Sequence, residues 1–159
     1  MVSSVRRPVL AVVLIAAAVP LGCGKGPTLH PVAGIVLLDG VPLEGASVGF
    51  SPEGPGGLPA SAQTTADGTF RLGTWIPAAG KVGTGASAGD YVVMIEKVDA
   101  PPVETFSSDD PRYGKVPPPA PKISYIVPQS YGVRETTPLR ATVRSGRNAF
   151  TFELDSKKP

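Results

Sequence analysis

The side chain whose chemistry and position are most informative is that of Cys23, the only cysteine in this chain of 159 residues. It closely follows an apolar run of eleven residues, 9–19, which itself comes just after the positive pair Arg6 and Arg7. A positive segment, a short apolar core and small residues before a cleavage point form a secretory signal. Eleven residues are too few to span the roughly 30 Å hydrocarbon layer as a helix. We therefore expect residues 1–22 to be a removable export signal.

The segment resembles a bacterial lipoprotein signal, in which the cysteine thiol receives a diacylglyceryl group and a peptidase cuts just before the cysteine. Gly22 and Cys23 match the pattern, and Pro20 stands where it prefers Leu. The resemblance implies lipidation of Cys23. Two or three acyl chains, at about 0.8 kcal/mol per buried methylene, would make the attachment permanent. Ordinary signal cleavage nearby and an uncleaved signal anchor are the alternatives.

Lipidation of Cys23 would place the protein in a bacterial cell envelope. The chain would be anchored on the periplasmic face of the inner or outer membrane, or on the cell surface, with the membrane as its first partner. Residues 23–31 would then be a short tether. The mature chain of about 137 residues suits one domain.

The rest of the chain offers little catalytic chemistry. His30, the sole histidine, lies in the expected tether, where a solvated imidazole is the ordinary state. Asp109 and Asp110 could bind calcium together with Asp99 and Glu104, but we favour a solvated charged loop. Acylation of Cys23 would remove the only thiol. We expect no catalytic residue, no metal and no cofactor.

The charge balance gives no reason to expect a nucleic-acid partner. Loss of Arg6 and Arg7 from the 15 basic residues leaves 13, which equals the number of acidic residues. The sequence has no basic run and no interleaving of basic and aromatic residues.

Three aromatic residues could contact a ligand, namely Trp75, Tyr125 and Tyr131. Exposed aromatic rings can stack on sugars or peptides, whereas buried rings pack in a core. Core packing or loop anchoring is the more common role, so we treat the three residues as candidates only.

Glycine and proline number 19 each and separate short runs of alternating apolar and polar residues. This pattern predicts short strands joined by turns. We expect strands at residues 32–38, 46–50, 91–97 and 123–127, the third of them central, and a turn from Asp39–Gly40 through residue 45. Residues 73–89 are predicted to be irregular, and the proline-rich residues 100–122 to form a surface excursion.

Two hairpins are predicted from register. A loop at residues 66–68 would place Thr65 opposite Thr69 and Ala62 opposite Leu72. A turn at Ser145–Gly146 would place Arg144 opposite Arg147 and would pair residues 139–143 with 148–152. In both hairpins the apolar side chains share one face, which is typical of a sandwich with one buried face. The expected fold is an all-β, seven-stranded antiparallel Greek-key β-sandwich.

The spacing of turn and core residues also resembles a carboxypeptidase regulatory-like domain. The matching residues are Val32, Gly34, Val36, Asp39, Gly40, Pro42, Leu43, Gly45, Ala46, Val48, Phe50, Thr65, Asp67, Gly68, Phe70, Leu72, Gly89, Tyr91, Val93 and Ile95. Small lipoproteins of this type, numerous in planctomycete bacteria, also end with a Tyr, a Thr-Pro-Leu strand and a Gly-Arg-Asn-x-Phe-x-Phe-x-Leu-like strand, here Tyr131, residues 137–139 and residues 146–154. The resemblance implies a transthyretin-like (prealbumin-like) sandwich over residues 32–155.

The family implies an accessory, adhesive or scaffolding role, since enzymes with this fold depend on several histidines. Our leading hypothesis is a non-enzymatic, lipid-anchored envelope protein with a binding or scaffolding domain. The alternative is a cell-wall or glycan-binding module that uses Trp75 and nearby tyrosines. An envelope hydrolase is the weakest hypothesis. The partner would be an envelope protein or a glycan.

Overall fold

The computed structural model describes residues 27–99, 106–117 and 123–157. The expected signal, Cys23 and most of the tether lie outside the described residues. Within the described part of the chain, no helix has the length and apolar character needed to cross a membrane.

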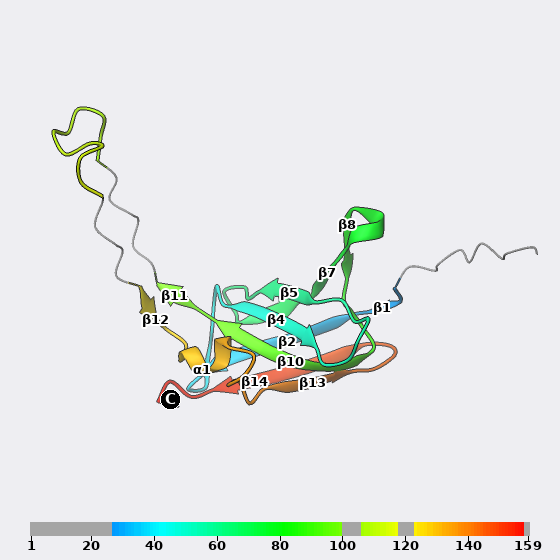
Figure 1. Cartoon of the computed structure of the whole chain (residues 1–159). Helices are drawn as coiled ribbons and strands as arrows, with labels where there is room; N and C mark the ends of the chain where they lie inside the picture. Colours follow the sequence, from blue (N-terminus) through cyan, green and yellow to red (C-terminus); the bar gives the residue numbers. More distant parts are fainter. Residues whose placement is uncertain (1–26, 100–105, 118–122, 158–159) are drawn as a thin grey trace, which may run out of the picture.

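Two β-sheets pack face to face around the hydrophobic core (Figure 1), which confirms the all-β sandwich. The larger sheet contains, in spatial order, β13 (Arg140–Val143), β10 (Gly89–Glu96), β4 (Ser47–Pro52), β5 (Ala60–Gln63), β7 (Gly73–Ile76) and β8 (Lys81–Thr84). In the smaller sheet, β2 (Val32–Leu38) pairs on one side with β14 (Asn148–Leu154) and on the other with β6 (Thr69–Arg71) and β3 (Val41–Pro42). The seven-strand Greek-key arrangement stays a prediction.

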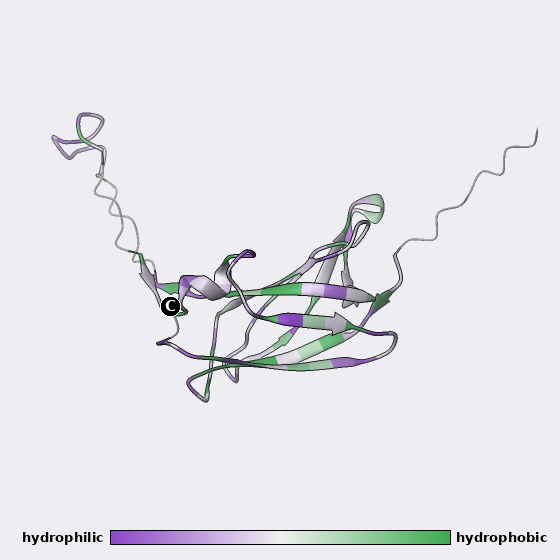
Figure 2. Cartoon of the chain, turned by 60° about the horizontal axis from the view of Figure 1, so that its bottom comes forward, coloured by the Kyte–Doolittle hydropathy of each residue, from purple (hydrophilic) through white to green (hydrophobic). Residues whose placement is uncertain are grey.

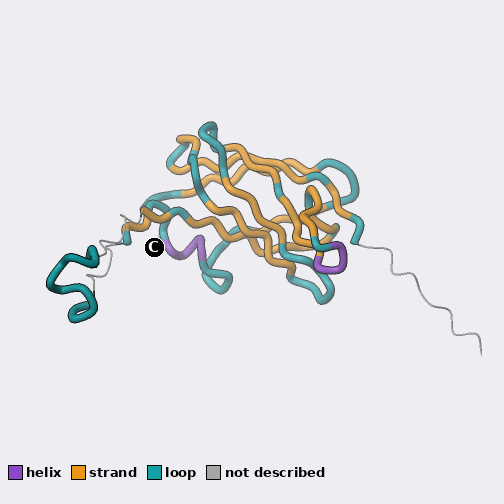
Figure 3. Tube along the Cα trace, turned by 90° about the horizontal axis from the view of Figure 1, so that it is seen from above, coloured by secondary structure: helices purple, strands orange, loops and turns teal. Residues whose placement is uncertain are grey.

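Two short ribbons and two helical turns complete the described structure. The ribbons are β1 (Leu29–His30) with β9 (Ala86–Ser87), and β11 (Val98–Asp99) with β12 (Ser124–Tyr125). The helical segments are the 3₁₀ turn η1 (Pro77–Ala79) and the helix α1 (Gln129–Gly132), both at the margins of the sandwich (Figure 3).

The strand predicted at 32–38 is confirmed as β2, and the strand predicted at 91–97 is β10, which begins at Gly89 and ends at Glu96. Strand β10 is an interior strand, because it lies between β13 and β4. The expectation of antiparallel pairing throughout is wrong at one place. Strands β2 and β14 run parallel, with Val32 opposite Asn148 and Leu38 opposite Leu154. Parallel strands need a long connection, and almost the entire domain lies between these two.

The predicted hairpin around residues 66–68 is wrong in its pairing. The turn exists, and Thr65 donates its N–H to the Thr69 carbonyl. Beyond it, however, β5 pairs with β4 and β7, whereas β6 pairs with β2 in the other sheet. The turn therefore moves the chain from one sheet to the other. Hydrogen bonds from Thr65 and Thr69 to the Asp67 carboxylate stabilise it and lower the pKa of Asp67.

The predicted C-terminal hairpin is wrong for the same reason. Strand β13 pairs with β10, and β14 pairs with β2, so the turn at Ser145–Gly146 also crosses between the sheets. The Asn148 side chain closes this turn by accepting from the Arg144 N–H and donating to the Arg144 carbonyl. The predicted faces are nevertheless correct. Residues 141, 143, 152 and 154 are buried, and residues 140, 142, 151 and 153 are exposed.

Strands form in one segment expected to be irregular and in one expected to be a turn. Residues 73–89 contain β7, η1, β8, β9 and the first residue of β10. Residues Val41–Pro42 form β3, which follows a two-residue turn at Asp39 and Gly40. Both turn residues have positive φ, because this conformation matches the twist of the two strands that the turn joins. In the expected excursion, the described residues 106–117 contain only loops and turns, and β11 pairs with β12 at its base.

The core comprises the inward side chains of both sheets, and hydrophobic and hydrophilic residues alternate along the strands (Figure 2). Phe50 of β4 lies at its centre. Its ring contacts Tyr91 in its own sheet and Phe70, Phe150 and Phe152 in the opposite sheet. One aromatic side chain thus joins both layers.

Gly34 marks the closest approach between β2 and its neighbours. A Cβ at this position would lie 2.4 Å from the Phe150 carbonyl oxygen and 2.6 Å from the Phe70 ring. The backbone oxygen belongs to the β14 ladder and cannot move without breaking strand pairing. The absence of a side chain at residue 34 therefore permits the aromatic cluster to form.

We predict that Gly34→Ala lowers the free energy of unfolding by about 2 kcal/mol, because it overpacks the core. Chemical denaturation followed by circular dichroism measures this change. Gly49→Ala is the matched control, since its Cβ would lie 3.5 Å from the Met94 methyl, an ordinary contact. The control should be neutral or slightly stabilising. Equal losses in the two variants would contradict the packing described for Gly34.

Candidate functional site

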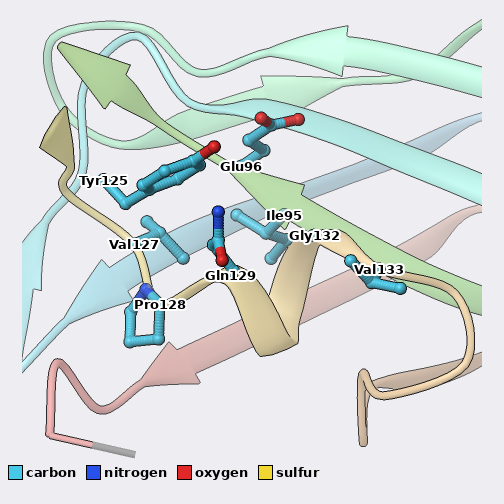
Figure 4. Close-up of a pocket in the computed structure, with 8 residues that line it drawn as sticks. All are labelled: Ile95, Glu96, Tyr125, Val127, Pro128, Gln129, Gly132 and Val133. Atoms are coloured by element: carbon cyan, nitrogen blue, oxygen red, sulfur yellow. The ribbon is translucent and has the colours of Figure 1, made fainter. Parts of the chain in front are cut away.

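A pocket of about 260 Å³ lies where β10 leaves the large sheet (Figure 4). It is lined by Ile95, Glu96, Tyr125, Val127, Pro128, Gln129, Gly132 and Val133. These residues come from β10, from β12 and from α1 with its flanking loops. The pocket is therefore built by segments that lie about 30 residues apart in the sequence.

Hydrogen bonds and buried side chains hold the α1 segment against β10. The N–H groups of Ile126 and Val127 donate to the Lys97 carbonyl, and Val127 is buried. After the helix, the buried Thr137 hydroxyl donates to the Val93 carbonyl at 2.8 Å. Both ends of the segment are thus attached to the central strand. These contacts hold the α1 segment beside β10.

Tyr131 is buried, with 3 % of its surface exposed. It packs in the core, and its hydroxyl accepts a hydrogen bond from the Asp155 N–H at 3.2 Å. Its proposed role as a ligand contact is therefore wrong for this structure. The Tyr131 side chain anchors the four-residue helix α1 to the sandwich.

Polar groups surround the mouth of the pocket and apolar groups form its wall. Figure 4 shows the Glu96 carboxylate, the Tyr125 hydroxyl and the Gln129 amide directed toward the same opening, while Ile95 and Val127 lie deeper. A carboxylate only accepts hydrogen bonds when ionised, and a hydroxyl or amide can both donate and accept. The pocket can hold an apolar or flat group and bind donors or a cation at its rim.

Trp75, the second predicted ligand contact, lies on the hairpin formed by β7 and β8. The indole is 55 % exposed and stands opposite Val82, which is 65 % exposed. Strand β8 is the last strand of the large sheet and β7 is its neighbour, so Val82 lies on the edge strand and Trp75 lies beside it. An exposed edge with apolar side chains can bind an extended peptide or a flat ligand.

The structure does not bring the predicted aromatic residues together. Tyr125, at 48 % exposure, lies beside β11 and the end of β10, and Trp75 lies beyond β4 and β5 at the far edge of the sheet (Figure 1). A single stacking platform made of Trp75 and the tyrosines is therefore not formed. Glu96 and Gln129 were not predicted as site residues. No feature of the sequence marks them, because they come close to Tyr125 only in the folded chain.

His30 and Asp110 have ordinary contacts, and Glu104 lies outside the described residues. His30 belongs to β1 rather than to a free tether, and its Nδ1 accepts a hydrogen bond from the Gly146 N–H at 3.2 Å. Arg112 forms an ion pair with Asp110 at 2.8 Å and lowers the pKa of that carboxyl. Among the described residues, no group of three or more potential ligands is placed to hold a metal ion.

Comparison with protein-family models, with curated proteins and with solved structures gives no match. The resemblance to carboxypeptidase regulatory-like domains therefore stays a prediction. A function for this chain must be inferred from its fold and from the geometry of its candidate sites.

We predict that Tyr131→Phe lowers the free energy of unfolding by about 1 kcal/mol, because the Asp155 N–H loses its acceptor. Tyr125→Phe should change stability by less than about 0.5 kcal/mol, because Tyr125 is a surface residue. Thermal unfolding of both variants measures the difference. The opposite order of stabilities would contradict the assignment of Tyr131 to the core and Tyr125 to the pocket rim.

Proposed function

We propose that this chain is a lipid-anchored protein of a bacterial cell envelope and that its sandwich is a binding or scaffolding domain rather than an enzyme. The carrying observation is the pocket at the end of β10, which combines apolar walls with Glu96, Tyr125 and Gln129 at its mouth. This composition is that of a binding site in which a few polar groups orient an apolar ligand.

The position of the pocket supports this role. Strand β1 pairs with β9, just before the start of β10, whereas the pocket lies at the other end of β10. The seven steps from Gly89 to Glu96 span about 24 Å in an extended strand. A chain held at its N-terminal side would therefore present the pocket away from its point of attachment.

The size of the pocket favours part of a larger partner. Pockets for free small ligands commonly have volumes of about 300–1,000 Å³. The present pocket, at about 260 Å³, suits one side chain or one ring. A segment of an envelope protein that presents an apolar side chain next to a basic group would satisfy both the wall and Glu96.

A glycan partner is the second candidate function, and the exposure of Trp75 favours it. A half-exposed indole on a protruding hairpin offers a flat apolar surface for a sugar ring. The two candidates use different parts of the molecule, namely the pocket and the β7–β8 hairpin, so substitutions can distinguish them.

We predict that Cys23→Ser abolishes lipid attachment and leaves an uncleaved precursor that is longer by the 22 signal residues. Membrane fractionation, detergent-phase partitioning and electrophoretic mobility measure the change in cells. Ser4→Ala is the control, because it alters the same segment and keeps the thiol. If the Cys23→Ser protein is processed and partitions as the wild type does, the lipid anchor is wrong.

The binding partner is tested with a photoreactive side chain at position 133, on the rim of the pocket, and a control at the outward-facing position 151. We expect a cross-link to an envelope protein from position 133 only. The yield of this cross-link should fall roughly tenfold when Glu96→Arg reverses the charge at the mouth of the pocket. Sedimentation with peptidoglycan, reduced by Trp75→Ala and not by Glu96→Arg, would instead establish the glycan-binding function.

A further inference from the structure

Four arginines gather around the turn between β13 and β14. Arg140, Arg144 and Arg147 line one open depression beside this turn. Arg147 also lines the adjoining depression, together with Arg71 of β6. All four side chains are exposed. They come from separate strands and one turn, so only the folded chain places them together.

Three of these guanidinium groups are available to an external anion. Arg140 forms an ion pair with Glu53 at 3.0 Å, and the nearby Asp90 carboxylate accepts a hydrogen bond from Thr142. Within the described part of the chain, Arg71, Arg144 and Arg147 form no ion pair. In a mature chain with equal numbers of acidic and basic residues, this end therefore has a local excess of positive charge.

The N-terminal strand lies at the same end of the molecule (Figure 1). His30 accepts a hydrogen bond from Gly146 in the middle of the arginine-bearing turn, and the Pro31 carbonyl accepts one from the Asn148 N–H at 2.9 Å. These bonds attach the beginning of the described chain directly to the turn. The described chain therefore begins at the arginine-rich end of the sandwich.

We propose that the face formed by Arg71, Arg144 and Arg147 docks on anionic phospholipid headgroups. This inference rests on the proposed lipid anchor at Cys23. Leu29 follows Cys23 by six residues, and an extended chain of that length spans about 21 Å at most. The anchor therefore keeps this end close to the bilayer, and the three guanidinium groups orient the domain on it.

The short distance matters because salt limits the electrostatic attraction. At physiological ionic strength the screening length is about 8 Å, so a basic group acts on lipid only when it is held near the surface. An arginine next to an anionic leaflet strengthens binding roughly fivefold. With this face on the membrane, the pocket at Glu96 points toward the solvent, where a partner can reach it.

The test uses the chain from residue 23 onward with Cys23→Ser, so that no acyl group contributes. Among the described residues, all those buried in the core lie between Val32 and Leu154, and this chain retains them. Sedimentation with phosphatidylcholine vesicles containing phosphatidylglycerol is compared with sedimentation with pure phosphatidylcholine. Both are measured at low ionic strength and roughly 20 mM lipid, because three fivefold effects give an association constant of only about 100 M⁻¹. We expect binding only to the anionic vesicles, and its loss at high salt.

Arg144→Gln with Arg147→Gln should weaken this binding by roughly 25-fold, the product of two fivefold effects. Lys97→Gln with Lys115→Gln is the matched control, because it removes the same charge from the residue after β10, at the pocket end, and from the loop 106–117. Circular dichroism confirms that each variant is folded. Equal weakening by both pairs, equal binding to neutral vesicles, or no binding to anionic vesicles would overturn the proposal.

Two further outcomes separate this proposal from its premises. If the chain binds polyglutamate and does not bind anionic vesicles, the arginine face is a binding surface for an acidic protein, and the lipid proposal is overturned. Because the tested chain has no lipid, its result does not depend on processing at Cys23. A failure of the Cys23→Ser fractionation experiment would therefore contradict the anchor alone, and a failure of vesicle binding would contradict the docking face alone.

Discussion

The packing of Phe50 between the two sheets is the interaction on which the rest of the structure depends. Its ring centroid lies 5.7 Å from that of Tyr91 and 5.9–6.5 Å from those of Phe150, Phe152 and Phe70. Such tilted and edge-on contacts add to the area that large aromatic side chains bury. The cluster fixes β4, β10 and β14 relative to one another. These strands in turn position the pocket at one end of β10 and the arginine-rich turn at the other.

The alternation of apolar residues was sufficient to predict which side chains face the core, but not which strands pair. At Ala66–Gly68 and at Ser145–Gly146 the expected hairpins are turns that cross between sheets. The expected hairpin pairing and the observed crossing both bury Phe70, Val143 and Phe152. Apolar and polar residues alternate in the same way in two strands that face each other across a core and in two strands that pair side by side. Sequence-local reasoning also cannot choose the parallel partner of β2, which is the last strand of the chain.

The candidate sites show the same division between local and long-range information. Trp75 is exposed because it lies on the β7–β8 hairpin, beyond the residues of β7 that pair with β5. Tyr131 is buried because it packs in the core with residues from distant segments. Arg144 and Arg147 bracket a predicted turn, so their proximity was visible in the sequence. Arg71 joins them only through the topology of the small sheet. The pocket likewise required three separate segments to meet.

In the proposed arrangement, Cys23 holds a binding domain on a membrane, with the basic end of the domain toward the lipid and its pocket toward the solvent. Mass spectrometry of the N-terminal peptide of the protein purified from bacterial membranes tests this arrangement most directly. The lipid anchor predicts a peptide that begins at Cys23 and has the added mass of a diacylglyceryl group, with or without a further acyl chain. A peptide that begins elsewhere, or that contains Cys23 as a free thiol, would contradict it.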